Sequence, residues 1–401
     1  MGGSSGTGAG GFELLSVTRV VFGRGTAVRA AELAAGLGKA ALVVGNAGDR
    51  GDGGATDRLA ELLAEAGVEA AFVRQRGEPT VTQIDAALAA ARSGGCDVVI
   101  GLGGGSAIDA AKAVAGLLTN GGSALDYMEV IGEGRKITRQ AAPWIAVPTT
   151  AGTGAEVTRN AVVSCPERRF KASIRGEQLL ARAAVVDPEL GVAVRPEITA
   201  RAGMDALCQL VESYTSAKAQ PVTDALARTG IERAGRSLLR AYRDGGDLAA
   251  REDMALAALL SGIALTNAGL GAVHGFAAPL GANLPVPHGT VCAALLAHVM
   301  AANVRALRAE SSDHPHLARY AAVGRMLAGQ GDLPDADAVD AGIRFVAELA
   351  CELAIPRLGE FGLTAEQVPD LVALARKSSS MRYNPVALPE ETLAAVLQAA
   401  I

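Results

Sequence analysis

The feature that most restricts the fold of this chain is a change of periodicity near its middle. In the first half, short aliphatic runs alternate with longer helical patterns, which predicts a mostly parallel sheet with helices on both faces. After "AAVVDPEL" (183–190), only Ala- and Leu-rich helical pattern remains. We therefore predict a Rossmann-like α/β region followed by an all-helical region. The expected strands are 16–23, 39–45, 69–75, 97–103 and 144–150, and the expected helices of the first half are 27–38, 55–67, 81–93 and 106–118.

Length and composition agree with two domains. The chain has 401 residues, more than one typical domain holds. We predict a flexible Gly/Ser lead over 1–12, an α/β domain over 13–187 and a helical domain over 188–401. Half of the residues are hydrophobic but only 3% are aromatic, so Ala, Val, Leu and Ile must fill the core.

Several classes of function are disfavoured by charge and cysteine usage. The net charge of −5 gives no basic excess for nucleic-acid binding. Five scattered cysteines without a CxxC pair are typical of reduced core thiols in a cytoplasmic protein. We see neither a signal peptide nor an apolar run near the ~20 residues of a membrane span, and we expect no membrane association. Ala-rich helical surfaces favour a homo-oligomer, a dimer or larger.

A glycine-rich turn follows one of the expected strands. In "VVIGLGGGSAIDAAKAVAGLL" (98–118), the aliphatic run leads into Gly103, Gly104 and Gly105, and a helix follows. Ser106 and Asp109 have the spacing of a capping box. The glycines would let an anion approach the helix N-terminus, where free N–H groups bind phosphate. A tight turn that needs glycine only for packing is the alternative.

A threonine-rich turn follows another strand. In "PWIAVPTTAGTGAEVTRNAVVS" (143–164), Thr149, Thr150 and Thr153 offer hydroxyl groups beside two glycines. Ligands of α/β sheets bind at the carboxyl ends of the strands. The threonines could instead only cap the next segment, but two polar glycine-rich loops in one domain favour a shared ligand.

Four residues of the helical half form a possible metal site. Asp205 and Gln209 are four residues apart in "GMDALCQLVESY", so they share one face of a helix, either as a surface pair or as half of a cation site. His274 and His288 bracket a Pro/Gly-broken segment, and each precedes a glycine. Together they could offer two oxygen and two nitrogen ligands to a divalent ion, which is one reading among several.

These motifs, in this order, resemble the iron-containing (group III) alcohol dehydrogenase family. The resemblance rests on GGGSAIDAAKAVA, PTTAGTGAEVT, DPEL, GMDAL and HG…PLG…PHG, and it extends from about residue 13 to beyond 380. It implies a dehydroquinate synthase-like architecture, with an active site between a dinucleotide-binding domain and a helical domain. The implied reaction is reversible hydride transfer between NAD or NADP and an alcohol, aldehyde or ketone.

The resemblance also implies roles for individual residues. Asp205, His274 and His288 match three of the family's four metal ligands, for Fe²⁺ or Zn²⁺. His274, His288 and Asp109 are the predicted catalytic residues. The predicted cofactor contacts are Gly104, Gly105 and Ser106 at the pyrophosphate, Thr149, Thr150 and Thr153 at the nicotinamide ribose and phosphates, Asp109 at the nicotinamide, Lys171 at a ribose hydroxyl, and Asn46 at the adenosine ribose.

Two departures from the family pattern leave alternatives open. Gln209 stands where the family has its fourth ligand, a histidine, and Ala278 replaces a histidine linked to proton relay. The site could hold a divalent ion with Gln209 as a weak fourth ligand. It could instead be metal-free, as in the maleylacetate reductases. The chain could also be a non-redox lyase related to dehydroquinate synthase, or a binding protein. Asn46 is neutral, so both NAD and NADP are compatible with it.

Overall fold

A six-stranded parallel sheet organises the N-terminal half of the chain. The structure, a computed structural model, describes residues 12–16, 19–45, 54–129, 131–168 and 170–401. The strand order is β1-β8-β5-β4-β2-β3, and every pairing in this sheet is parallel. The predicted fold class is therefore confirmed. The strands are β1 (Val20–Phe22), β2 (Ala40–Gly45), β3 (Glu69–Arg74), β4 (Val98–Gly103), β5 (Trp144–Pro148) and β8 (Ala183–Val186).

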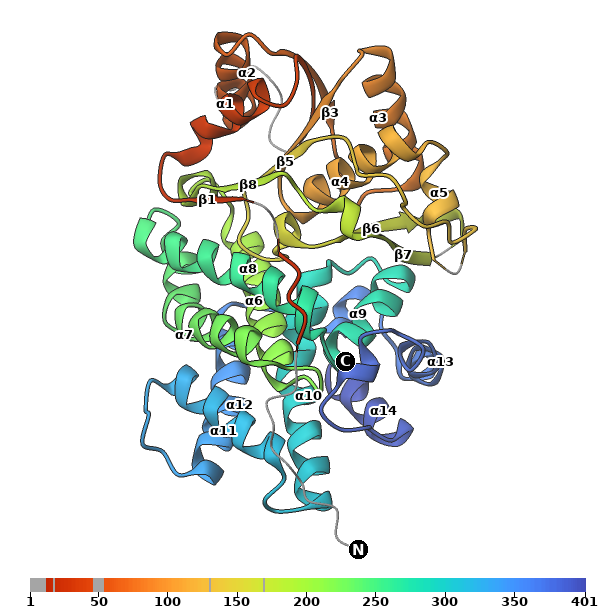
Figure 1. Cartoon of the computed structure of the whole chain (residues 1–401). Helices are drawn as coiled ribbons and strands as arrows, with labels where there is room; N and C mark the ends of the chain where they lie inside the picture. The colour runs from red at the N-terminus through yellow and green to blue at the C-terminus, as the bar shows by residue number, and fades with distance from the viewer. Residues whose placement is uncertain (1–11, 17–18, 46–53, 130, 169) are drawn as a thin grey trace, which may run out of the picture.

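Helices cover both faces of this sheet (Figure 1). The helices are α1 (Arg29–Ala35), α2 (Ala55–Glu65), α3 (Val81–Ser93), α4 (Gly105–Asn120) and the short α5 (Ala124–Tyr127). In β2, Ala41 and Val43 pack with α1 and α2, whereas Leu42 and Val44 pack with α3 and α4. Both faces need apolar side chains, which explains the continuous aliphatic runs of the sequence.

The strand order reverses between β2 and β4. The chain runs from β2 outward to β3 and then returns to place β4 on the other side of β2. Ligands of open α/β sheets bind outside the carboxyl ends of the strands at such a switch point. The glycine-rich turn follows β4 there.

The predicted elements lack strand β8 of the sheet and also a separate antiparallel hairpin. The hairpin consists of β6 (Asn160–Cys165) and β7 (Phe170–Arg175), paired from Asn160↔Arg175 to Cys165↔Phe170. Alternate residues of β6 are buried, which is the pattern of a strand with one covered face. Of the strand predicted at 16–23, the described residues contain β1, Val20–Phe22.

The C-terminal half is helical and packs around one large apolar cluster. The long helices α6, α7, α8 and α10 bury mainly Ala, Val, Leu and Met side chains against one another. Four of the five cysteines are buried, while Cys351 is exposed, contrary to the expectation of core thiols throughout. The helices are α6 (Pro196–Thr215), α7 (Pro221–Arg243), α8 (Leu248–Ala268), α9 (Ala272–Asn283), α10 (His288–Glu310), α11 (Pro315–Ala328), α12 (Asp335–Glu352), α13 (Val368–Ala375) and α14 (Glu390–Ala399).

Helix α10 contains an apolar stretch as long as a membrane span, which the sequence was not expected to contain. By length and composition it could cross a membrane, and α8 and α9 pass the same test only as a pair bent by 101°. However, 67% of the apolar stretch of α10 is buried inside the fold. Figure 1 shows α10 running through the helical region with other helices beside it, which is the position of a core helix.

Candidate active site

The glycine-rich turn places a helix N-terminus at a cavity. Helix α4 begins at Gly105, with Gly104 at the N-cap position and no side chain capping the helix. The predicted capping box of Ser106 and Asp109 is therefore wrong, because Ser106 already lies in the first helical turn. An uncapped N-terminus leaves N–H groups for a ligand, so this end of the helix fits a phosphate.

Thr153 packs directly on the start of that helix. A Cβ added to Gly105 would lie 2.7 Å from both Cγ2 and Oγ1 of Thr153. Only glycine lets the two loops approach this closely. The glycine-rich and threonine-rich turns are thus joined at one point, as the shared-ligand interpretation requires.

Asp109 takes part in a buried polar network. Its carboxylate accepts a hydrogen bond from Val162 N at 2.9 Å and pairs with Lys112 Nζ at 3.1 Å. Lys112 Nζ also donates to Thr158 Oγ1 and to Asn160 O, at 2.8 and 2.6 Å. Burial raises the pKa of Asp109 and lowers that of Lys112, and each charge opposes the shift of the other. Asp109 therefore ties α4 to the β6–β7 hairpin.

One cavity brings most of the predicted residues together. It has a volume of about 760 Å³, within the range of ligand sites. Lys171 reaches it from β7 and forms an ion pair with Glu78, which also lines the cavity. The predicted residues in its wall are Gly105, Ser106, Asp109, Thr153, Lys171, Gln209, His274 and His288.

The remaining predicted residues lie elsewhere. Thr149 and Thr150 line a smaller pocket of about 30 Å³, beside Asp187 and Arg251. Asn46 lies outside the described residues. All of the predicted cofactor contacts, those of Thr149, Thr150 and Asn46 included, stay predictions.

At the helical side of the cavity, three helices bring four donor atoms together. His274 Nε2 and His288 Nε2 lie 3.3 and 3.5 Å from Asp205 Oδ1. Cys292 Sγ lies 3.6 and 3.7 Å from the same two nitrogens. All four atoms are within 4.8 Å of one another. Asp205 Oδ1 is buried and has no hydrogen-bond partner, and a bound cation would satisfy it.

Local sequence explains how the helices approach one another. Gly289, which follows His288, lies against α6: a Cβ there would be 2.3 Å from the carbonyl oxygen of Arg201. Glycine at this position lets the start of α10 reach Asp205. Gly289, the glycine of the second His-Gly pair, thus has a packing role.

Glu212 is a site residue that is absent from the prediction. It is buried on α6, seven residues after Asp205, and its Oε2 lies 2.6 Å from His274 Nδ1. Its Oε1 accepts a hydrogen bond from Val273 N at 2.7 Å. A carboxylate behind a ligating imidazole fixes the ring and its tautomer. The seven-residue spacing from Asp205, two helical turns on the same face, is the signal that could identify it.

Gln209 does not direct its side-chain oxygen freely at the four-atom cluster. Its Oε1 accepts a hydrogen bond from Ser261 Oγ at 2.7 Å. Coordination of a metal by Gln209 Oε1, as predicted for a weak fourth ligand, would therefore compete with this hydrogen bond. Cys292, four residues after His288 on α10, is the donor that the sequence analysis leaves among the core thiols.

The electrostatics of the cluster favour a positive charge. Burial alone would raise the pKa of Asp205, but His288 and His274 hold it well below its usual range. For His288, burial is outweighed by Cys292 and Asp205, which raise its pKa to about 10. Burial raises the pKa of the Cys292 thiol well above its ordinary value. A carboxylate that stays ionised in the interior needs a cation beside it.

Comparison with known families decides the assignment. Residues 17–188 match the iron-containing alcohol dehydrogenase model, and residues 199–401 match the model of the C-terminal part of the same family. This chain belongs to the iron-containing alcohol dehydrogenase family. It is 34% identical to the choline dehydrogenase of Bacillus subtilis (strain 168), over 89% of this chain and 87% of that protein.

Solved structures agree with this iron-containing alcohol dehydrogenase assignment. A 1,3-propanediol oxidoreductase has a TM-score of 0.89 and 33% identity, covering 97% of this chain and 100% of that one. A sulfoacetaldehyde reductase from Bifidobacterium kashiwanohense, in complex with NAD⁺, has a TM-score of 0.83 and 28% identity, covering 97% of this chain and 98% of that one. The chain is therefore an oxidoreductase of the alcohol dehydrogenase type.

Proposed function

We propose that this enzyme transfers hydride between NAD or NADP and a small alcohol or aldehyde inside the 760 Å³ cavity. One observation carries the proposal. The same cavity is lined by the uncapped start of α4, at Gly105 and Ser106, and by the imidazoles His274 and His288. A cofactor whose phosphates sit at the helix N-terminus can extend toward those imidazoles, where the reacting carbon would lie.

The two halves of the chain would divide this work. In the proposal, 13–187 binds the cofactor and 188–401 supplies the substrate pocket and the metal ligands. Lys171, held by Glu78, offers a cation to the cofactor side. Asp109 would act by holding the β6–β7 hairpin in place, since both carboxylate oxygens are already engaged.

Asp205, His274 and His288 would hold a divalent ion. Such an ion acts as a Lewis acid that polarises the substrate oxygen. The substrate oxygen would lie beside His274 and His288, which line the cavity, and the tight packing of α6 against α10 would exclude water from the helical side. Ala277 and Ala278 line the cavity with small side chains, which leaves room for a substrate longer than a simple two-carbon alcohol.

The test measures oxidation of NADH and of NADPH with a panel of aldehydes. We expect turnover with at least one aldehyde, a ratio of kcat/KM that ranks the two cofactors, and loss of activity after chelation that added metal restores. Asp205→Ala should abolish that restoration. Activity that survives both chelation and Asp205→Ala would support the metal-free alternative. Absence of any oxidation of NADH or NADPH with every aldehyde of the panel would contradict the proposal.

The homo-oligomer and the cytoplasmic location stay predictions.

A further inference from the structure

We propose that Cys292 is the fourth metal ligand of this enzyme, replacing the histidine that is missing at position 209. The site would then be a one-oxygen, two-nitrogen, one-sulfur set that prefers Zn²⁺ to Fe²⁺. This inference rests on the proposed metal-dependent function, and it specifies the residue that completes the site.

Four of the six distances among the donor atoms match a tetrahedral site, and the other two are within 4.8 Å. Zinc bonds of about 2.0–2.1 Å to oxygen and nitrogen, and about 2.3 Å to sulfur, give tetrahedral edges of about 3.3 Å between oxygen and nitrogen and about 3.6 Å between nitrogen and sulfur. The observed edges are 3.3 and 3.5 Å from Asp205 to the two imidazoles. Those from Cys292 to the imidazoles are 3.6 and 3.7 Å. Sulfur thus lies at the distance expected of a fourth ligand, and the substrate oxygen would join the ion as a fifth, a coordination number to which catalytic zinc can expand.

An independent observation shows that one oxygen of this cluster lacks a hydrogen-bond partner. Asp205 Oδ1 is fully enclosed and has no hydrogen-bond partner, although a buried carboxylate oxygen without one is costly. It faces the same two imidazoles that Cys292 faces. A cation among the four atoms would satisfy this oxygen and the two ring nitrogens at once.

The helix geometry makes the substitution possible. Cys292 lies four residues after His288, so both side chains project from the same face of the first turns of α10. Asp205 and position 209 have the same relation on α6. A ligand can therefore be lost from one helix and supplied by the other while the centre of the site stays in place.

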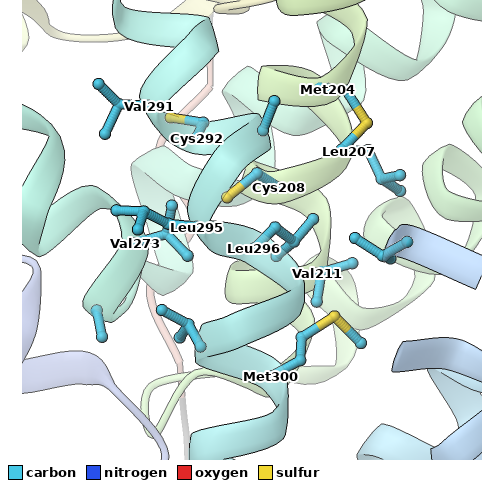
Figure 2. Close-up of a cluster of buried hydrophobic side chains, with 14 of the residues drawn as sticks. Met204, Leu207, Cys208, Val211, Val273, Val291, Cys292, Leu295, Leu296 and Met300 are labelled. Atoms are coloured by element: carbon cyan, nitrogen blue, oxygen red, sulfur yellow. The ribbon is translucent and has the colours of Figure 1, made fainter. Parts of the chain in front are cut away.

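Cys208 provides a natural control. It is as deeply buried as Cys292, and Figure 2 shows both sulfurs at the packed interface of α6 and α10. Cys208 Sγ, however, lies 3.9 Å from His274 Nδ1, on the ring edge that Glu212 occupies. Cys208 thus lies on the opposite side of the imidazole from Asp205; its thiol interacts with that of Cys292, but it is outside the four-atom cluster.

The donor set determines which ion is preferred. A thiolate ligand selects zinc over ions that prefer oxygen and nitrogen ligands. Binding would release the thiol proton to solvent, because only the thiolate coordinates. We expect the protein, expressed in medium with equal iron and zinc, to contain mainly zinc, at one ion per chain.

The decisive experiment is Co²⁺ titration of the chelator-treated full chain. The wild type should show a sulfur-to-cobalt charge-transfer band in the near ultraviolet and intense tetrahedral bands in the visible. Cys292→Ser should lose the near-ultraviolet band and bind Co²⁺ about 100-fold more weakly, since even outer-shell changes cost 10–100-fold. Cys208→Ser and Gln209→Ala should keep both the band and the affinity. Circular dichroism confirms that each variant is folded.

The outcomes separate this inference from the proposed function. One cobalt ion per chain with no charge-transfer band, unchanged in Cys292→Ser, would overturn the role of Cys292 and leave the metal-dependent function standing. Loss of the ion in Gln209→Ala but not in Cys292→Ser would return the fourth ligand to Gln209. No cobalt binding by a wild-type protein that still oxidises NADH or NADPH would overturn both.

Discussion

Replacing Glu212 by Gln tests how the metal site is oriented. The Glu212 carboxylate only accepts hydrogen bonds, so His274 Nδ1, 2.6 Å away, must carry a hydrogen. That tautomer leaves the Nε2 lone pair, 3.3 Å from Asp205 Oδ1, free for a cation. In Glu212→Gln, the amide oxygen can keep the bond from Val273 N, and the NH₂ group then takes the place of Oε2. It donates to Nδ1 and moves the ring hydrogen to Nε2, where it blocks the metal.

The expected magnitude follows from the bonds that change. A buried hydrogen bond to a charged group contributes about 1.5–3 kcal/mol, and losing a carboxylate behind a ligating histidine costs roughly 10- to 100-fold in metal affinity. We therefore expect Glu212→Gln to raise the dissociation constant for Zn²⁺ by about 10- to 100-fold. Competition with a fluorescent chelator measures this constant, and ¹⁵N NMR of labelled histidine reports the tautomer directly.

Ser261→Ala is the matched control for this prediction. It removes an equally buried hydrogen bond to α6, the one from Ser261 Oγ to Gln209 Oε1 at 2.7 Å, without touching the residue behind His274. Its metal affinity should remain at the wild-type level. A folded Glu212→Gln protein that binds Zn²⁺ as tightly as the wild type, with the hydrogen still on Nδ1, would refute the reasoning.

Three further changes probe other parts of the structure. Gly289→Ala places a Cβ 2.3 Å from the carbonyl oxygen of Arg201; overpacking of this kind costs about 1–3 kcal/mol, so urea unfolding should show lower stability and the metal content should fall. Gly105→Ala brings a Cβ to 2.7 Å from Thr153; steady-state kinetics should show a rise in KM for the nicotinamide cofactor larger than that for the aldehyde. Burial raises the pKa of Glu156 to about 7, above its ordinary value of 4.5. As pH rises between these values, the unfolded state loses this proton first, so the free energy of unfolding should fall by about 3 kcal/mol; urea melts of Glu156→Gln should lack most of that fall, and an unchanged fall would contradict this account.

The fold was predictable wherever periodicity was strong. The helix expected at 81–93 is α3 with the same bounds, and the strand 97–103 differs from β4 by one residue. The β6–β7 hairpin escaped prediction because it follows a loop whose threonines and glycines suggested irregular structure. Its position depends on tertiary contacts, among them the hydrogen bonds from Val162 N to Asp109 and from Lys112 Nζ to Asn160 O, which sequence spacing does not reveal.

The candidate site shows a different limit. Asp205, His274 and His288 were predictable because their residue types are uncommon in a core and their motifs are recognisable. Cys292 was not, because a buried cysteine among aliphatic residues is ordinary. Yet the four-residue helical spacing that relates Gln209 to Asp205 also relates Cys292 to His288. When a family ligand is missing, positions four residues from each remaining helical ligand should therefore be searched for a replacement, and the fourth donor in this chain is found on the opposite helix.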